Sequence, residues 1–247
     1  MSRTTTLFHV SDLHFGYEDR AALDWFASEV ARDRPDWIVC TGDVTMRGTA
    51  REFVAAARWL GNLAAPVSLE IGNHDVPYYW YPLARVFRPY RLYRELDGVL
   101  SRRVDLPDVA AVSLSTVAAF QWRLNLSKGR VAAAALDQAL GELSHVQHKP
   151  LRLVTCHHPL LDADTHSRGS TRGGGRALAA LTRAGAQAVL SGHVHDPFDR
   201  TVDCQGQPIR LIGAGTLSPR LRATQPSYNR LDWSPGTGLH VQVRAAE

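Results

Sequence analysis

The sequence predicts an α/β fold built around a parallel or mixed β-sheet. Along most of its 247 residues, short apolar runs of strand length alternate with segments whose apolar residues recur every three or four positions. After residue 198 only strand-like runs follow. Alternation of these two patterns is typical of βαβ units, in which helices cover the faces of a sheet.

Each expected element follows from its own pattern. The segment 20–32 has apolar residues at positions 22, 23, 26, 27 and 30, which form a stripe along one face of a helix. The run Trp37–Cys40 is wholly apolar and is expected to be a strand. The same criteria predict helices at 49–63, 132–146 and 176–184. They predict further strands at 6–10, 67–71, 104–114, 151–155, 188–190, 200–202, 209–212, 229–233 and 239–243. Because no repeat or linker is visible, residues 1–247 are expected to form a single domain.

Two segments lack a regular pattern. Residues 161–175 contain glycine, serine, arginine and histidine without periodicity and are expected to form a mobile loop. The segment Tyr78–Leu96 is rich in aromatic residues and arginine, and two prolines break any long helix there. It could form a lid or wall of a substrate pocket, with Arg85 and Arg88 holding phosphate oxygens. It could instead cover the sheet edge or form a homodimer contact, and this second interpretation is favoured.

Composition limits the class of protein. A hydrophobic content of 45% and a charged content of 21% are those of an ordinary globular protein. The net charge of +4 suits a small anionic substrate, but the basic residues are scattered and form no clear nucleic-acid surface. The three cysteines form no disulfide framework, which favours a reducing compartment. No signal region or apolar run long enough for a membrane span is present, so we expect a cytoplasmic protein.

Two histidines lie one residue apart at the end of an apolar run, in Ala188–Pro197. In an extended chain, His193 and His195 would point to the same side, and Gly192 is expected to let the chain turn. Neutral imidazole is the commonest nitrogen ligand of metals, so the pair suits a metal centre. An isolated pair of this kind would more often lie in an exposed loop. The residues at the other strand ends therefore determine whether a metal centre is the better interpretation.

Four other expected strands end in residues that can bind metals. Ligands gather beyond the carboxyl ends of strands in α/β sheets, so these side chains are expected to meet. One such end proves little, because aspartate and asparagine are common in turns. With the histidine pair, five strand ends carry the same kind of residue, which turn chemistry alone does not explain. The candidates at the other four ends are Asp12 and His14, Asp43, Asn73, and His157.

These blocks, taken in order, resemble the calcineurin-like metallophosphoesterases, and specifically their bacterial phosphodiesterase branch. The family pattern is DxH, GD, GNH(D/E), a single histidine, and GHxH. This chain matches it with Asp12–His14, Gly42–Asp43, Gly72–Asp75, His157 and Gly192–His195. The resemblance implies a four-layered α/β/β/α sandwich of two mixed sheets flanked by helices. It also implies two metal ions at the strand ends.

The resemblance also implies a role for each matched residue. Asp43 would bridge the two metals and serve catalysis by doing so. His74 would not bind metal but would act on the leaving group as a catalytic residue. Asp75 would either orient His74 or cap the turn that follows. The resemblance selects His157 rather than His158 as the ligand, leaving His158 to face the substrate or to support the ligands. The remaining ligands would be Asp12, His14 and His195 for one metal, and Asn73, His157 and His193 for the other. Nitrogen and oxygen donors without thiolate suit Mn, Fe, Zn or Co.

The implied activity is hydrolysis of a phosphoester by in-line attack of a metal-bridging hydroxide. The expected substrates are small diesters such as a cyclic nucleotide or a glycerophosphodiester. A phosphomonoesterase and a pyrophosphatase of nucleotide-linked lipids use the same chemistry and remain alternatives. A non-catalytic scaffold with the same fold is less favoured, because scaffolds typically lose ligands and all seven ligand positions are present here. A DNA nuclease is also disfavoured, because no DNA-binding domain is appended.

Overall fold

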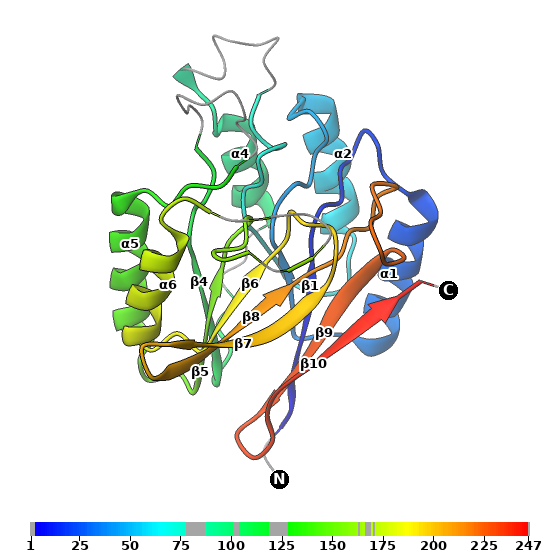
Figure 1. The fold of residues 1–247 in the computed structure, drawn as a ribbon. Coiled ribbons are helices and arrows are strands. Elements are labelled where there is room, and N and C mark those ends of the chain that lie inside the picture. Colours follow the sequence, from blue (N-terminus) through cyan, green and yellow to red (C-terminus); the bar gives the residue numbers. More distant parts are fainter. Residues whose placement is uncertain are drawn as a thin grey trace.

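The computed structural model of the chain describes residues 3–77, 87–100, 104–118, 128–162, 164–165, 169 and 171–246. Two five-stranded β-sheets dominate this part of the molecule (Figure 1). The first sheet has the order β10-β9-β1-β2-β3 and consists of β1 (Thr5–Val10), β2 (Trp37–Cys40), β3 (Val67–Leu69), β9 (Ser227–Ser234) and β10 (Gly238–Ala245). The second has the order β4-β5-β6-β8-β7 and consists of β4 (Val109–Ser113), β5 (Leu151–Thr155), β6 (Ala188–Ser191), β7 (Phe198–Cys204) and β8 (Gln207–Gly213).

Both sheets are mixed. In the first, β1, β2 and β3 are parallel, whereas β9 and β10 run antiparallel to their neighbours. In the second, β4, β5, β6 and β8 are parallel and β7 is antiparallel to β8. The carboxyl ends of all parallel strands within a sheet therefore lie at one edge.

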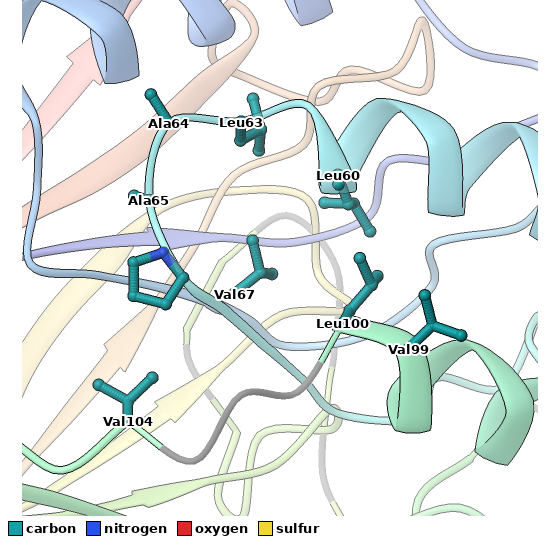
Figure 2. A pocket seen from close by; sticks show the side chains of 10 residues that line it. Leu60, Leu63, Ala64, Ala65, Val67, Val99, Leu100 and Val104 are labelled. Atoms are coloured by element: carbon teal, nitrogen blue, oxygen red, sulfur yellow. The ribbon is translucent and has the colours of Figure 1, made fainter.

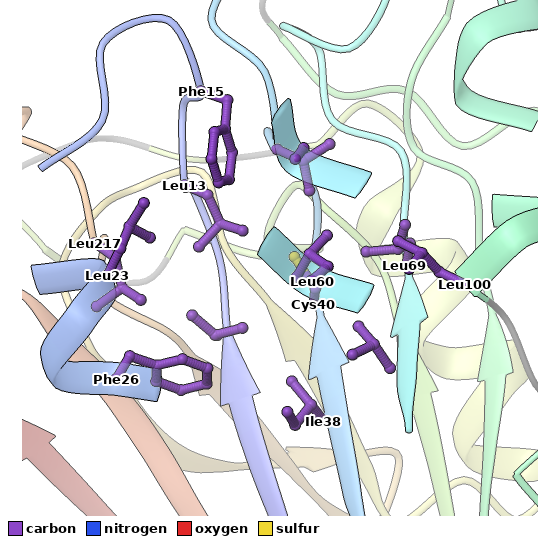
Figure 3. Close-up of a cluster of buried hydrophobic side chains, with 14 of the residues drawn as sticks. Leu13, Phe15, Leu23, Phe26, Ile38, Cys40, Leu60, Leu69, Leu100 and Leu217 are labelled. Atoms are coloured by element: carbon purple, nitrogen blue, oxygen red, sulfur yellow. The ribbon is translucent and has the colours of Figure 1, made fainter. Parts of the chain in front are cut away.

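Helices cover the outer face of each sheet, and the inner faces pack on one another. The first sheet is covered by α1 (Arg20–Asp33), α2 (Ala50–Gly61) and α4 (Arg91–Leu100), and the second by α5 (Ala133–His145) and α6 (Gly174–Arg183). Alternation along β1 places Phe8 against the helices and Leu7 against the second sheet. Phe8 belongs there to the same cluster as Phe26 and Leu60, which Figure 3 shows. Leu7 meets Leu153 and Leu190 from the second sheet. The predicted α/β/β/α sandwich of two mixed sheets is confirmed.

Local sequence signals explain most of the boundaries. Thr49 caps α2, and Glu52 bonds back to the backbone of Thr49, which completes a capping box. The strand expected at 104–114 is confined to β4, since Pro107 just before it cannot donate to a ladder. The helix α4 was not predicted, because most of it lay inside the segment 78–96, which we interpreted as broken by proline. It begins at Arg91, two residues after Pro89, and a proline in front of a helix removes none of the helix's hydrogen bonds. Residues 78–86 of that segment lie outside the described residues.

An apolar pocket of about 560 Å³ opens between the end of α2, the start of β3 and the end of α4 (Figure 2). Leu60, Val67 and Leu100 line it. It lies at the amino end of β3, whereas Asn73 follows the carboxyl end, so it is separate from the predicted metal centre. Among the described residues, no helix combines the length and the apolar character that crossing a bilayer requires.

Glu70 follows β3 and ties the two sheets together. Its Oε1 accepts a hydrogen bond of 2.5 Å from Thr155 Oγ1 on β5, and its Oε2 accepts one of 2.7 Å from Ser113 Oγ on β4. Burial raises the pKa of this carboxyl to about 7, although the two hydroxyl donors act in the opposite direction. Glu70 therefore connects the two sheets through a carboxyl group that is difficult to ionise in the folded protein.

Glu70→Gln is expected to change the pH dependence of stability. The carboxyl of Glu70 titrates near 4.5 in the unfolded chain and near 7 in the folded protein, so the folded state holds its proton longer. The wild type is therefore expected to lose stability as pH rises from about 5 to about 7, whereas glutamine cannot ionise. Chemical denaturation measures the free energy of unfolding of both proteins. The value for the variant relative to the wild type should rise by roughly 2–3 kcal/mol between pH 5 and pH 8. Glu95→Gln, at an exposed position on α4, is the control. A pH-independent difference for Glu70→Gln would contradict the assignment.

Candidate metal centre

The predicted ligands converge where the carboxyl ends of the parallel strands of both sheets meet. Asp12 and His14 follow β1, and His195 follows β6, yet one donor atom from each lies within 4.8 Å of the others. Asp12 also groups with Asp43 and His157, which follow β2 and β5. Asn73 Oδ1 lies 3.2 Å from Nε2 of His157. The structure thus gathers residues that are far apart in the sequence.

The backbone at these positions adopts an unusual conformation. Eight described residues other than glycine have a positive φ, and five of them are predicted ligands. Those five, with their φ angles, are Asp12 (57°), His14 (49°), Asp43 (52°), His193 (70°) and His195 (62°). The left-handed region costs an L-residue free energy unless its surroundings impose it, and such residues cluster at functional sites. The fold therefore holds these side chains in position through strained turns.

Three motif glycines allow the turns to approach one another. A Cβ atom at Gly72 would collide with the backbone nitrogen and the carboxylate of Asp43. A Cβ atom at Gly192 would collide with the hydroxyl of Ser11 and lie 2.7 Å from Asp12 Oδ2. Gly42 has both a φ of 100° and close neighbours. The chain turns at Gly192 as expected, since Val194 N donates to Gly192 O over 2.9 Å. Gly192 itself has no positive φ, so a glycine is needed there for space and not for a left-handed backbone.

Three of the histidines predicted to bind metal are oriented by backbone carbonyl groups. The Nδ1 atoms of His157 and His195 lie 2.8 Å from Thr41 O and 2.7 Å from Arg220 O. The Nδ1 atom of His14 lies 3.4 Å from Thr45 O. A carbonyl oxygen only accepts hydrogen bonds, so Nδ1 is the protonated nitrogen and Nε2 carries the lone pair. This arrangement is the usual support of a metal-binding histidine.

Asp12 carries a buried oxygen that fits a cation. Its Oδ2 accepts a 2.9 Å hydrogen bond from the backbone nitrogen of His193. Its Oδ1 is buried and accepts no hydrogen bond, although His195 Nε2 lies 3.1 Å and His14 Nε2 3.7 Å away. With Nδ1 of both histidines protonated, their lone pairs face this oxygen. Such a set is stable when a cation lies between the donors, so the residues present fit a metal ion.

Asp43 lies between the two groups of ligands. Its Oδ2 is 3.4 Å from His157 Nε2, and its Oδ1 accepts a 2.8 Å hydrogen bond from the backbone nitrogen of His74. It also groups with His14, on the other side of the centre. The ring of His193 completes the His157 side, with the two ring centroids 5.2 Å apart. Asp43 therefore occupies the position that a bridging carboxylate needs.

The charges of the site are shifted by burial and by the two carboxylates. Burial alone would raise the pKa of Asp43, but His157 and His74 outweigh it and hold that pKa well below its usual value. Burial would lower the pKa of His157, but Asp43 raises it to about 9. Burial lowers the pKa values of His14 and His193 to about 4, so both imidazoles are neutral at pH 7. Asp43 is therefore an ionised carboxylate beside two neutral imidazoles and one that holds a proton, and a bound cation would take the place of that proton.

His74 and Asp75 have separate surroundings. The Nδ1 atom of His74 lies 2.7 Å from Met46 O, which leaves its Nε2 with a lone pair. The carboxylate of Asp75 accepts hydrogen bonds from the backbone nitrogens of Gly72 (2.9 Å) and Thr45 (2.8 Å). Asp75 therefore fixes the turn that precedes it and joins that turn to Thr45, whereas the two roles expected for it were to orient His74 or to cap the turn that follows. No contact between its side chain and the ring of His74 is observed among the described residues.

The residues expected to contact substrate are placed unequally. His158 is buried beside His193, with ring centroids 4.4 Å apart, and its Nδ1 lies 3.0 Å from Thr116 Oγ1. Arg88 is exposed and lines a pocket of about 320 Å³ together with Asp75 and Pro77. Arg85 lies outside the described residues.

Arg220 is a member of the site that sequence reasoning missed. Its carbonyl oxygen orients His195, and its Nη1 lies 3.1 Å from His74 Nε2. It belongs to the segment that follows β8, which is parallel to β6. The rule that ligands gather at the carboxyl ends of strands applies to β8 as well and could have pointed to this segment.

Comparison with known proteins agrees with this geometry. A family model described as calcineurin-like phosphoesterase matches residues 5–197. Over 222 residues the chain is 29% identical to the 3',5'-cyclic adenosine monophosphate phosphodiesterase CpdA of Pseudomonas aeruginosa, covering 84% of this chain and 74% of the relative.

Two solved structures share the fold at low sequence identity. One is a dimetal phosphatase from Danio rerio, with a TM-score of 0.64, 13% identity and coverage of 98% of this chain and 99% of that one. The other is GAP50, described as the anchor in the inner membrane complex of Plasmodium, with a TM-score of 0.61, 13% identity and coverage of 98% and 84%. At such identities the likeness shows the fold alone, but the family model spans most of the sequence. The chain therefore belongs to the calcineurin-like phosphoesterase family.

Proposed function

We propose that the protein is a binuclear metal-dependent phosphodiesterase that acts on small diesters such as a cyclic nucleotide or a glycerophosphodiester. The observation that carries the proposal is the buried, unpartnered Oδ1 of Asp12 facing the Nε2 atoms of His14 and His195. A proton or a cation is needed there, and the donor set suits a divalent metal. Asp43 then provides the oxygens for a second metal beside His157.

The ligand sets are those that the resemblance implies. Metal identity is open among Mn, Fe, Zn and Co, which all accept nitrogen and oxygen donors. When bound, two such ions would acidify a water molecule to give a nucleophile at neutral pH and would offset negative charge developing on phosphorus. Asp12, His14 and His195 would hold one metal, and Asn73, His157 and His193 the other, with Asp43 shared.

His74 is placed to act on the leaving oxygen. Its Nδ1 proton is held by Met46 O, so the ring cannot turn without breaking that bond. A proton for the leaving group would therefore come from Nε2, which faces the site and would first have to take up a proton, because it now accepts from Arg220 Nη1. Its ring stands edge-on to that of His14, with centroids 4.9 Å apart. The geometry supports a role for His74 as proton or hydrogen-bond donor to an ester oxygen.

Two observations bear on the substrate class. The relative from Pseudomonas aeruginosa is a phosphodiesterase, which favours a diester, and Arg88 lines a pocket beside the turn that carries His74 and Asp75. A phosphomonoesterase or a nucleotide-lipid pyrophosphatase remains the alternative, because the same donors serve either substrate. A scaffold function is less favoured, since every predicted ligand except Asn73 falls within a cluster of candidate metal donors and Asn73 lies beside His157.

Hydrolysis of bis-p-nitrophenyl phosphate is expected to exceed that of p-nitrophenyl phosphate at equal concentration. The test compares both esters with the protein loaded with Mn, loaded with Zn, and stripped by a chelator. Stripping should abolish turnover, and adding metal back should restore it. Faster turnover of the monoester would favour the monoesterase. The absence of turnover of either ester with any metal would overturn the enzymatic proposal and favour a scaffold.

A further inference from the structure

The guanidinium of Arg220 is directed into the metal centre. Its Nη1 lies 3.1 Å from His74 Nε2, 3.3 Å from His14 Nε2 and 3.9 Å from Met46 Sδ. Its own backbone is fixed, because its carbonyl oxygen accepts from His195 Nδ1 at 2.7 Å and its nitrogen donates to Ser218 Oγ at 3.4 Å. The side chain is half-buried, and these two hydrogen bonds fix the backbone from which it extends.

This cation has no anionic partner in the part of the chain that the structure describes. The carboxylates of the centre lie beside histidines, and no ion pair between them and Arg220 is found among the described residues. The guanidinium instead faces the Nε2 atoms of His14 and His74, whose Nδ1 atoms lie against backbone carbonyl oxygens. A guanidinium is always charged in proteins and matches the oxygens of carboxylate or phosphate far better than it matches a ring nitrogen.

The two imidazoles cannot remain its partners when the site is loaded. The Nε2 lone pair of His14 is the one assigned to a metal, and one lone pair cannot serve both a metal and an N–H donor. A guanidinium beside two divalent cations would also be repelled unless an anion lay between them. The geometry therefore requires an anionic acceptor close to His14 and His74, where the proposed reaction places the phosphoryl group.

We propose that Arg220 binds a non-bridging phosphoryl oxygen of the substrate, a role that rests on the proposed phosphoesterase function. When the phosphoryl oxygen is present, the N–H that now donates to His74 Nε2 donates to that oxygen instead. Nε2 of His74, released from Arg220, can then take up a proton from solvent and donate it to the leaving oxygen. Arg220 thus both holds the phosphoryl group and controls whether His74 is available.

A purely structural role of the side chain predicts different results. In that case the guanidinium would only hold the rings of His14 and His74, and its removal would lower metal occupancy. The carbonyl oxygen that orients His195 belongs to the backbone and remains in any substitution. Binding of inorganic phosphate to the metal-loaded protein separates the two roles, because it reports anion affinity without requiring turnover.

The test uses Arg220→Ala, Arg220→Lys and, as the matched control, Arg51→Ala, which removes a cation from the exposed face of α2. Each protein is loaded with Mn, and metal content, phosphate affinity by calorimetry, and kcat and KM for bis-p-nitrophenyl phosphate are measured. Arg220→Ala should keep its metal but bind phosphate roughly 10- to 100-fold more weakly. Arg220→Lys keeps the positive charge but loses the paired N–H donors of the guanidinium. Its phosphate affinity should lie between those of the wild type and Arg220→Ala. Added guanidinium ion should partly restore phosphate binding to Arg220→Ala and not to the control.

Phosphate affinity of Arg220→Ala within about twofold of the wild type would overturn the proposal, and so would a loss of metal that accounts for the weaker binding. Failure of phosphate to bind the metal-loaded wild type would overturn it as well. If the wild type binds metal and phosphate but hydrolyses neither ester, the phosphoesterase function fails. The anion-binding role of Arg220 would still be decided by calorimetry.

Discussion

Asp43→Asn is expected to reduce hydrolysis of bis-p-nitrophenyl phosphate by about a thousandfold or more. Asparagine keeps an oxygen that can accept from the backbone nitrogen of His74, so the turn should remain folded. It removes the negative charge and one of two oxygens that the metals would share, and stabilisation worth several kcal/mol is lost with them. Measured metal content is expected to fall at the same time.

Asp105→Asn provides the matched control for Asp43→Asn. Asp105 is 87% exposed and pairs with Lys149, near the amino end of β5 and away from the centre. This variant should keep full activity and full metal content. Normal catalysis by Asp43→Asn with two bound metals would contradict the bridging assignment, whatever the stability of the variant.

Gly72→Ala is expected to destabilise the protein by about 3 kcal/mol or more. The new Cβ would collide with the backbone nitrogen of Asp43, and a backbone atom cannot move aside as a flexible side chain can. For a chain of this size the loss corresponds to a fall in melting temperature of roughly 6–12 °C. Thermal unfolding followed by circular dichroism measures it directly.

Gly141→Ala shows what the same chemical change does without a collision. Gly141 lies inside α5, and a Cβ atom there would have nothing within 4 Å. Alanine is the better helix former, so this variant should gain about 0.5–1 kcal/mol. Equal melting temperatures for Gly72→Ala and the wild type would mean that the two turns do not approach as closely as described.

The sequence predicts much of the site because its residues follow strands that are easily recognised. Asp12, Asp43 and His157 each come two or three residues after the end of a strand, and the shared edge of parallel strands brings them together. Their residue types, aspartate and histidine, also indicate metal binding. The strands themselves are predictable because the period of apolar residues separates strands from helices. Their division into two sheets was implied by the family resemblance and not by the period.

Other parts of the site carry no signal in residue type. The atoms that orient His157 and His74 are carbonyl oxygens of Thr41 and Met46, and every residue has such an oxygen. Their position depends on the turns, not on the side chains. Arg220 stands 25 residues after His195, and nothing in its neighbours distinguishes it from the exposed arginines of the chain. The contact of Glu70 with both sheets likewise depends on how the sheets stack.

The donors of the metal centre divide between two sheets that are held together mainly by apolar contacts. Asp12, His14, Asp43 and Asn73 belong to the first sheet's segments, and His157, His193 and His195 to the second's. Any ion bound among them would link residues of one sheet to residues of the other. Because such an ion binds the native chain and not the unfolded one, occupancy and resistance to unfolding rise together.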